Sequence, residues 1–482
     1  MKKKFISIAL SLTLVAALFA GCGGKKDDKP TDSKATEAPA SNDKDEAKAT
    51  EAPAALPADT GKVLNIWAWN SNVKDTVFDA GYVPGYTNDG KGGGSFGDVK
   101  VKWNITPNAN NAYQIALDAA LLEQANAPAD KKIDMFLIEA DYSLKYAGVE
   151  PAVAMSMDEL GLTDAMKDQY QYTKDIVTDS KGAVRGSCYQ AAPGLYVYRR
   201  SIAKAVLGTD DPEQVQAKIS NWDDFDAVAA QMKAKGYTML AGYDDAYRPY
   251  SYSMKGPWVQ DGKIVIDDIM MKYVDKTKEY TEKGYNKKDS LWGATWTKEQ
   301  TNAGKTFGYF YSTWGINFTL ADNSRKDPKK PRGADNNNGV WGDWAVCYGP
   351  QAYAWGGTWF MAAVGTDNAN LVKQIIFDTT CNKDNMKKFA EESNDYTNNV
   401  PAMEEIANSD YKSDFLGGQN HYKLFAEVAK NLKMGPMSPY DQGCNEAFQK
   451  ATKDYYDGKV TKEKAIENFY KDVLKRYPDI KK

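Results

Sequence analysis

The sequence predicts an α/β fold, in which buried strands alternate with amphipathic helices. Short apolar runs rich in Val, Ile, Tyr and Phe have strand character, segments with helical periodicity follow several of them, and polar or aromatic residues stand directly after the runs. The chain has 482 residues, enough for two or three ordinary domains. We therefore expect several domains, with ligand-facing groups at the ends of strands.

The amino-acid composition narrows the range of possible functions. The 12 Trp and 30 Tyr are amphipathic rings that suit wet binding surfaces. A formal net charge of −4 without a basic block argues against a nucleic-acid partner. The single histidine, His421, leaves little from which to build a His-based metal site or a Ser-His-Asp triad. We expect no cofactor, no metal and no catalytic residues.

The N-terminus predicts export and a lipid anchor. A basic start precedes the apolar run 5–20, which is too short to span a bilayer comfortably, so residues 1–21 read as a signal peptide. The ending LFAGC resembles a bacterial lipobox, with Phe19 where Leu is usual, and this likeness implies a diacylated Cys22. The alternative is an ordinary signal peptide with an incidental cysteine.

A low-complexity segment follows. Residues 23–61 are crowded with Lys, Asp, Glu, Ala, Pro and Thr, and the hexapeptide ATEAPA occurs at 35–40 and again at 49–54. Such a composition buries too little to offset its ordering entropy, so we expect 22–61 to be a disordered tether. As a coil it would hold the folded part roughly 35 Å from the membrane.

Three strands and a helix are predicted in the first part of the folded body. The apolar runs 63–69, 99–105 and 133–138 read as strands, and 112–126 reads as a helix. Trp69 and Asn70 lie at the end of the first strand, and Glu139 and Asp141 follow the third. Carboxylates at the end of a buried strand lie in the ligand crevice of α/β proteins. For Asp141, a helix N-cap is an equally good interpretation.

The middle of the chain repeats this pattern. Residues 187–200 read as an extended crossover, and 221–235 as an amphipathic helix that Asn221 caps and Gly236 ends. A strand at 238–241 then delivers polar and aromatic residues, namely Asp244, Asp245, Tyr247 and Arg248.

The segment 306–320, TFGYFYSTWGINFTL, is the clearest strand-to-helix transition. A strand-like run is followed by Ser312 and Thr313, which can cap a helix, and then by Trp314 at the mouth of the expected crevice. The alternative is that Trp314 packs in the core, as most large aromatic residues do.

The last third adds more aromatic residues. In 349–365 a Gly pair, where the backbone can approach a ligand closely, stands among Tyr353, Trp355 and Trp359. A turn at 437–441 contains Tyr440 and Asp441. Further helices are expected at 272–283, 371–394, 421–432 and 462–476. Four tryptophans are assigned to the core by default, namely Trp258, Trp292, Trp341 and Trp344.

Cysteine and acidic clusters give weaker signals. The even number of cysteines after Cys22 permits disulfides, but their spacing leaves the pairing open, and free buried thiols are equally plausible: Cys188, Cys347, Cys381 and Cys444. The run 335–339 has calcium-compatible oxygens but lacks the Glu that completes a calcium loop, so we interpret it as a polar turn.

Taken in order, these features resemble a known family. They are the lipobox, the tether, the Trp-rich first strand and the segments IDMFLIEADYSLKYA, NWDDFDAVAAQMKAKGYTML, YFYSTWG and WGGTW. They resemble the extracellular solute-binding proteins of carbohydrate ABC importers (family 1, maltose-binding type) over residues 62–482. The order and spacing of the motifs carry the likeness.

The resemblance implies a two-lobe periplasmic-binding-protein-like fold, with crossover segments joining the lobes and the ligand cleft between them. The expected lobes are 62–185 with roughly 366–435, and 186–365 with roughly 436–482. The implied protein is not an enzyme. It is a monomer, anchored on the outer face of the cytoplasmic membrane, that delivers an oligosaccharide to ABC permease subunits.

The likeness also assigns site residues. Asn70 falls near a polar contact position, Asp141 matches a position that binds sugar hydroxyls, Trp314 matches an aromatic platform, and Tyr440 falls near a further aromatic site. Ile138 replaces an aromatic residue of the maltose binder, which argues against maltose itself. The candidate ligand-binding residues are Trp69, Asn70, Asp141, Asp245, Tyr247, Arg248, Trp314, Trp355, Trp359, Tyr440 and Asp441.

Two other functions stay open at this point. An anchored glycoside hydrolase needs two carboxylates across a cleft, which Asp141 and Asp245 could supply. A binder of polyamines or other small cationic solutes would pair ammonium groups with acids beside Trp faces. A purely structural surface lipoprotein is a third reading.

Overall fold

A seven-stranded mixed sheet organises the first part of the folded chain. The computed structural model describes residues 55–327, 339–433, 435 and 437–482. The strand order is β2-β3-β4-β1-β5-β12-β6. The strands are β1 (Val63–Ala68), β2 (Tyr86–Asn88), β3 (Gly94–Phe96), β4 (Val99–Ile105), β5 (Met135–Glu139), β6 (Ser187–Cys188) and β12 (Thr358–Ala362).

Strand β5 lies in the middle of the sheet and is buried on both faces. Met135 and Leu137 belong to one hydrophobic cluster, whereas Phe136 and Ile138 belong to another. Side chains of a strand alternate between the two faces, so each face of the sheet has its own core. The continuous apolar run that predicted a buried strand is explained by this double coverage.

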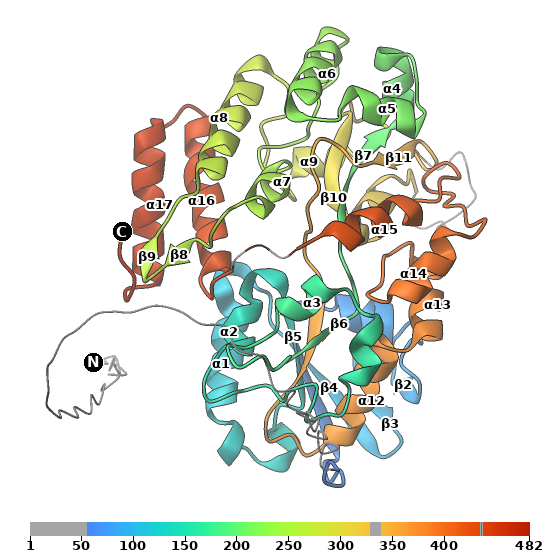
Figure 1. Ribbon diagram of the computed structural model, residues 1–482, viewed down its shortest axis with the longest axis vertical. Helices are drawn as coiled ribbons and strands as arrows, with labels where there is room; N and C mark the ends of the chain where they lie inside the picture. Colours follow the sequence, from blue (N-terminus) through green and yellow to red (C-terminus); the bar gives the residue numbers. More distant parts are fainter. Residues whose placement is uncertain (1–54, 328–338, 434, 436) are drawn as a thin grey trace, which may run out of the picture. The chain divides into compact units, whose positions relative to one another are not determined.

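Strand β12 returns to this sheet from a distant part of the sequence. It pairs antiparallel with β5, with Thr358 opposite Glu139, and appears in orange beside that strand in Figure 1. The expected lobe boundary at residue 365 placed β12 in the second lobe, and this detail is wrong because its backbone hydrogen bonds join it to the first sheet.

A second sheet is smaller and entirely antiparallel. Its order is β10-β7-β11, with Gly308 of β10 opposite Tyr198 of β7. Its strands are β7 (Gly194–Arg199), β10 (Gly308–Ser312) and β11 (Trp344–Cys347), and a separate hairpin contains β8 (Val259–Gln260) and β9 (Lys263–Ile264). Residues 189–193 link β6 to β7, and 348–357 link β11 back to β12, so the predicted crossover at 187–200 does join the two sheets.

Helices surround both sheets. Asn221 caps α6 (Trp222–Ala234) as predicted, because its side chain accepts a hydrogen bond from the Asp224 N–H. Figure 1 shows α16 and α17 side by side at the C-terminus. The helices are α1 (Ala112–Leu122), α2 (Ser143–Ala147), α3 (Gln171–Asp175), α4 (Arg200–Leu207), α5 (Pro212–Lys218), α6 (Trp222–Ala234), α7 (Tyr247–Tyr252), α8 (Asp268–Lys283), α9 (Ala294–Lys298), α10 (Thr313–Gly315), α11 (Ala321–Asn323), α12 (Ala369–Thr380), α13 (Lys383–Ser393), α14 (Val400–Ala407), α15 (Tyr422–Asn431), α16 (Asp441–Tyr456) and α17 (Lys462–Arg476).

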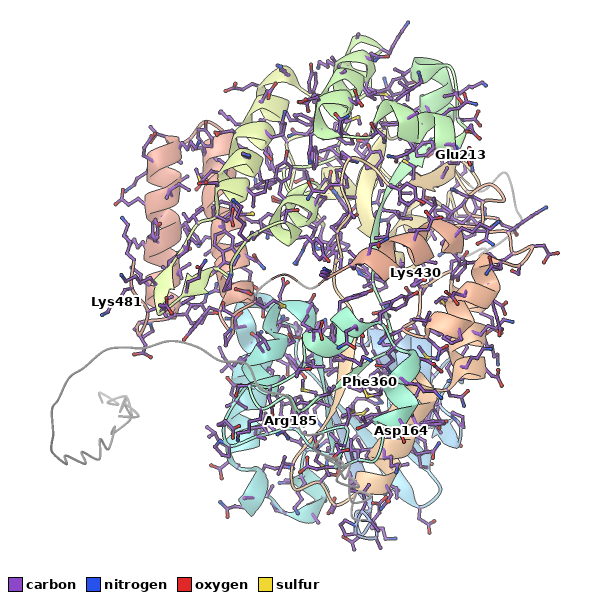
Figure 2. The ribbon with its side chains drawn as sticks, in the orientation of Figure 1. Asp164, Arg185, Glu213, Phe360, Lys430 and Lys481 are labelled. Carbon is purple, nitrogen blue, oxygen red and sulfur yellow. The ribbon has the colours of Figure 1, made fainter. Side chains whose placement is uncertain are left out.

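The helices of the range 366–435 are divided between the two sheets. Val372 of α12 lies in the core of the first sheet, whereas Met403 of α14 and Phe425 of α15 share a cluster with Tyr309 of β10. Figure 2 shows the usual contrast between inside and outside, with Phe360 of β12 buried and Lys430 of α15 largely exposed. Within the described ranges, no helix is both long enough and apolar enough to cross a bilayer.

The predicted strand at 238–241 does not form. In this segment the structure has a single isolated bridge, which is parallel and joins Thr238 to Thr306. The N–H groups of Met239 and Leu240 both donate to the Tyr285 carbonyl, and those of the next two residues donate to the Asp245 carboxylate. These donors are therefore unavailable for a sheet ladder.

Candidate functional site

Aromatic side chains from both sheets enclose the larger of two cavities near the crossovers. This cavity has a volume of about 320 Å³. Such a volume lies at the lower end of the range for small-molecule sites. The aromatic residues that line it are Trp69, Tyr247, Trp292, Trp314, Phe318 and Trp355.

Trp314 takes its place because β10 ends just before it, as the sequence predicted. Its indole Nε1 donates to the Trp355 carbonyl at 2.8 Å, and the two rings meet edge to face with centroids 4.9 Å apart. Trp355 in turn lies parallel to Tyr311 of β10. Gly356 has φ +81°, and a Cβ there would approach the Trp314 Nε1 to 2.9 Å. The Gly pair thus lets the backbone pass close to this ring.

Asp141 and Arg248 join the two halves of the site. Arg248, on α7, donates two hydrogen bonds of 2.7 Å, one to each carboxylate oxygen of Asp141, which follows β5. Their side chains are 23% and 15% exposed. Burial opposes ionisation of Asp141, but the guanidinium outweighs it and holds the pKa of this carboxyl below its ordinary value.

Glu139 ends β5 beside this ion pair. Its side chain accepts a hydrogen bond from the Asp141 N–H at 2.9 Å. Burial and the negative charge of Asp141 raise the pKa of Glu139 to about 8, although Arg248 opposes this shift. Arg248 and Glu139 both line the larger cavity, which therefore has one partner of an ion pair beside a carboxyl group that binds its proton unusually tightly.

Asp245 is buried, and its hydrogen bonds are to the protein itself. One carboxylate oxygen accepts from the N–H groups of Ala241 and Gly242 at 2.7 and 2.8 Å, and the other accepts from Trp296 Nε1 at 2.7 Å. Burial raises its pKa to about 7. It lines the larger cavity, but its contacts are those of a residue that positions a loop.

The smaller cavity has a volume of about 100 Å³ and shares Arg248 and Trp355 with the larger one. Asp141, Trp359 and Asp441 also line it. Trp359 is 3% exposed, and its Nε1 donates to the Thr173 carbonyl at 2.8 Å.

Asp441 and Tyr247 also form hydrogen bonds within the protein. Asp441 accepts hydrogen bonds from the backbone and hydroxyl of Ser438, and burial raises its pKa to about 6. Tyr247 is buried and donates to the Asn445 Oδ1, which also accepts from Trp258 Nε1.

Two other predicted residues lie at the margins. Asn70 lines the larger cavity, and its side-chain oxygen accepts from the Asn72 N–H at 2.9 Å. Tyr440 lines neither of these cavities. It faces a third one, of about 190 Å³, where its ring packs against Tyr477 with centroids 5.0 Å apart.

Sequence reasoning missed Trp292 and Phe318, and the assignment of Trp292 to the core is wrong. Trp292 is 50% exposed and Phe318 is 51% exposed. A signal for Trp292 was present, because Trp followed by Gly occurs at Trp292, Trp314, Trp341 and Trp355, and three of these four line the larger cavity.

The described cysteines line neither cavity. Cys188, Cys347, Cys381 and Cys444 are buried free thiols. Cys22 and residues 335–338 of the predicted polar turn lie outside the described residues. Among the residues that the structure describes, no group of three or more His, Cys, Asp and Glu side chains could hold a metal ion.

Known proteins resemble this chain in sequence pattern and in fold. A family model described as bacterial extracellular solute-binding protein matches residues 95–416. A comparison with curated proteins gave no match. A solved structure named as an extracellular solute-binding protein of family 1 superposes with a TM-score of 0.66 at 16% identity, covering 87% of this chain and 99% of the other.

Two more solved structures have the same fold. The ABC-transporter-associated binding protein of B. animalis subsp. lactis Bl-04, in complex with β-1,6-galactobiose, has a TM-score of 0.61 at 17% identity and covers 86% and 97% of the chains. The galacto-N-biose/lacto-N-biose I-binding protein of Bifidobacterium longum has a TM-score of 0.60 at 13% identity, covering 88% and 100%. The expected two-lobe α/β fold is therefore confirmed. The chain belongs to the bacterial extracellular solute-binding protein family, whose members bind solutes and are not enzymes.

Proposed function

We propose that this protein captures an oligosaccharide outside the cell and delivers it to the permease of an ABC importer. The observation that carries the proposal is the larger cavity, in which aromatic rings from both sheets lie beside hydrogen-bonding side chains. A sugar ring has an apolar C–H face and a rim of hydroxyl groups. Aromatic rings stack on the face, while charged and amide groups bond to the rim.

The ligand-binding residues proposed are those that combine a place in a cavity with an accessible group. Trp69 and Trp314 supply ring faces, Asn70 supplies an amide, and Asp141 with Arg248 supplies charged partners for hydroxyl groups. Asp245 and Trp359 support the site from behind, because burial and internal hydrogen bonds occupy their polar atoms.

A thermal-shift screen of residues 61–482 tests the proposal. The panel contains mono- and oligosaccharides, with polyamines and amino acids as controls. A ligand held a thousandfold above its Kd adds about 4 kcal/mol, several degrees of melting temperature even for a large protein. We expect a shift with one saccharide series, which Trp314→Ala abolishes and the same change at buried Trp344 does not.

Three other outcomes would redirect the assignment. A polyamine shift that disappears at high salt would make the protein a cation binder. The backbone and indole donors that occupy Asp245 argue against it. No shift with any compound would favour a structural role. Release of products from an oligosaccharide would revive the glycoside hydrolase.

The proposal includes the anchor and the division into lobes. Cys22 carries the lipid and 22–61 forms the tether, and together they hold the protein on the outer face of the cytoplasmic membrane. The protein acts there as a monomer. Cys22→Ser should move the protein from the membrane fraction to the medium and abolish labelling by a palmitate analogue. We propose one lobe around the seven-stranded sheet with α12, and a second around the three-stranded sheet with α14 to α17.

A further inference from the structure

Trp292 is an exposed tryptophan at the mouth of the larger cavity. Half of its surface is accessible to solvent, although burial of such a ring is strongly favourable. It lines the cavity together with Trp314 and Phe318. An exposed aromatic ring that faces a cavity is a feature of binding sites, where the apolar surface is covered by a ligand.

The backbone of Trp292 is in the left-handed region, with φ +67°. For a bulky residue this conformation is unfavourable, and it persists only where surrounding contacts fix it. The Asp244 carboxylate accepts from the Leu291 N–H at 3.0 Å, and Gly293 donates to the Ser290 carbonyl at 2.9 Å. These two hydrogen bonds hold the residues on both sides of the ring.

A second carboxylate fixes the following turn. One oxygen of Asp289 accepts from the N–H groups of Thr295 and Trp296 at 2.9 and 3.0 Å. Trp296 is buried, its Nε1 is bonded to Asp245, and its ring meets that of Trp292 with centroids 5.2 Å apart. The exposed ring therefore rests on a buried one that is itself anchored.

The ring of Trp292 also lies next to the principal aromatic residue of the site. The centroids of Trp292 and Trp314 are 6.2 Å apart, and their planes differ by 31°. Two adjacent rings at a similar tilt extend the apolar surface beyond what one sugar ring covers.

We infer that Trp292 is a stacking residue for a second sugar unit and selects saccharides of two or more units over monosaccharides. This inference rests on the proposed function, which it deepens. Asp244 is the positioning residue that holds the Trp292 loop through the Leu291 N–H, and it also lines the larger cavity. Asp244, which could suggest a cationic ligand, thus has a structural task in a sugar site.

Calorimetric titration of Trp292→Ala and the wild type tests this. The probes form two series. The first contains glucose, maltose, maltotriose and maltotetraose, and the second contains galactose and β-1,6-galactobiose. In the series that binds, we expect Trp292→Ala to lower affinity for the disaccharide and longer chains at least tenfold and for the monosaccharide less than twofold. Trp292→Phe should recover most of the loss, and Trp341→Ala, the same change outside both cavities, should leave every affinity unchanged.

The outcomes separate the two proposals. If the wild type binds no saccharide, the proposed function fails. If the wild type binds a saccharide series but Trp292→Ala changes no affinity, or changes all chain lengths equally, the inference about Trp292 is wrong and the proposed function stands. A wild type that binds monosaccharides alone would also overturn the inference.

A double-mutant cycle of Asp244 and Trp292 tests the positioning role of Asp244. Asp244→Ala should weaken binding of the longer chains in the wild type and have no additional effect in Trp292→Ala, because both changes remove the same contact. Asp244→Asn keeps an acceptor for the Leu291 N–H and should restore most of the affinity. Additive losses would show that Asp244 acts independently of Trp292. The melting temperature of each unliganded variant shows whether the fold is intact.

Discussion

Arg248 is the residue on which the charge balance of the site depends. It faces Asp141 through two hydrogen bonds and lies beside Glu139. Removing one partner of a largely buried ion pair leaves an uncompensated charge, which costs about 3–5 kcal/mol. We expect Arg248→Met to lower the free energy of unfolding in urea at pH 7 by this amount.

A surface pair provides the control for that measurement. Lys450 and Asp472 are 75% and 41% exposed, and exposed pairs contribute up to about 1 kcal/mol. Lys450→Met should therefore cost no more than this. Equal losses in the two variants would mean that the Asp141–Arg248 pair is no more important than a surface contact.

Glu139 should make stability depend on pH. Its pKa in the folded protein is about 8, above the ordinary value of 4.5, so the folded state holds the proton more tightly than the unfolded state does. The associated stability is fully present below about pH 4.5 and is lost as the pH rises towards 8.

The neutral variant Glu139→Gln removes this contribution and keeps an acceptor for the Asp141 N–H. We expect the free energy of unfolding of the wild type to fall, relative to that of Glu139→Gln, between pH 5 and pH 8. Urea titrations at four pH values measure the difference. A difference that does not vary with pH would show that Glu139 is ionised throughout this range.

At the scale of elements, Asp395 connects three segments that are far apart in the sequence. Its two carboxylate oxygens accept from the Thr313 hydroxyl, directly before Trp314, and from the Gln190 amide, in the first crossover. Asp395 itself follows α13 and is 4% exposed. It thus fixes the start of the Trp314 turn relative to the crossover.

Asp395→Ala should therefore affect stability and binding together. Each buried partner left unsatisfied costs about 1–3 kcal/mol, and the Trp314 ring loses a nearby support. We expect a lower melting temperature and weaker binding of the saccharide that stabilises the wild type. Asp472→Ala, at an exposed ion pair with Lys450, should change neither. Unchanged affinity in Asp395→Ala would show that the turn holds without this contact.

The elements that sequence reasoning placed correctly are those with a strong local signal. Strand β5 is apolar at every position but its last, α6 has a capping Asn and a following Gly, and Trp314 follows a strand-like run. The strand expected at 238–241 fails because its N–H groups donate elsewhere. Those of Met239 and Leu240 donate to the Tyr285 carbonyl, which tertiary structure brings there, and those of Ala241 and Gly242 donate to the nearby Asp245 carboxylate. The exposure of Trp292 depends on tertiary packing and was not predictable from residue type alone.

For the whole molecule, the path of the chain between the two sheets was the hardest feature to predict. The chain passes from β6 to β7, returns from β11 to β12, and later passes from α12 to the helices beside β10. Each passage is short, and its position depends on backbone pairing between residues such as Thr358 and Glu139. A local pattern contains no information about such pairing, so the predicted boundary at residue 365 missed β12.

The ion pair between Asp141 and Arg248 also predicts how the whole molecule responds to ligand. It joins the residue after β5 to α7, so it favours a closed arrangement of the two lobes. In the double variant Asp141→Asn with Arg248→Gln, we expect the unliganded protein to have a larger radius of gyration than the wild type, measured by small-angle X-ray scattering. A saturating saccharide should reduce the radius in both proteins. Identical unliganded radii would show that the ion pair does not favour closure, and unchanged radii with a bound saccharide would show that recognition requires no movement of the lobes.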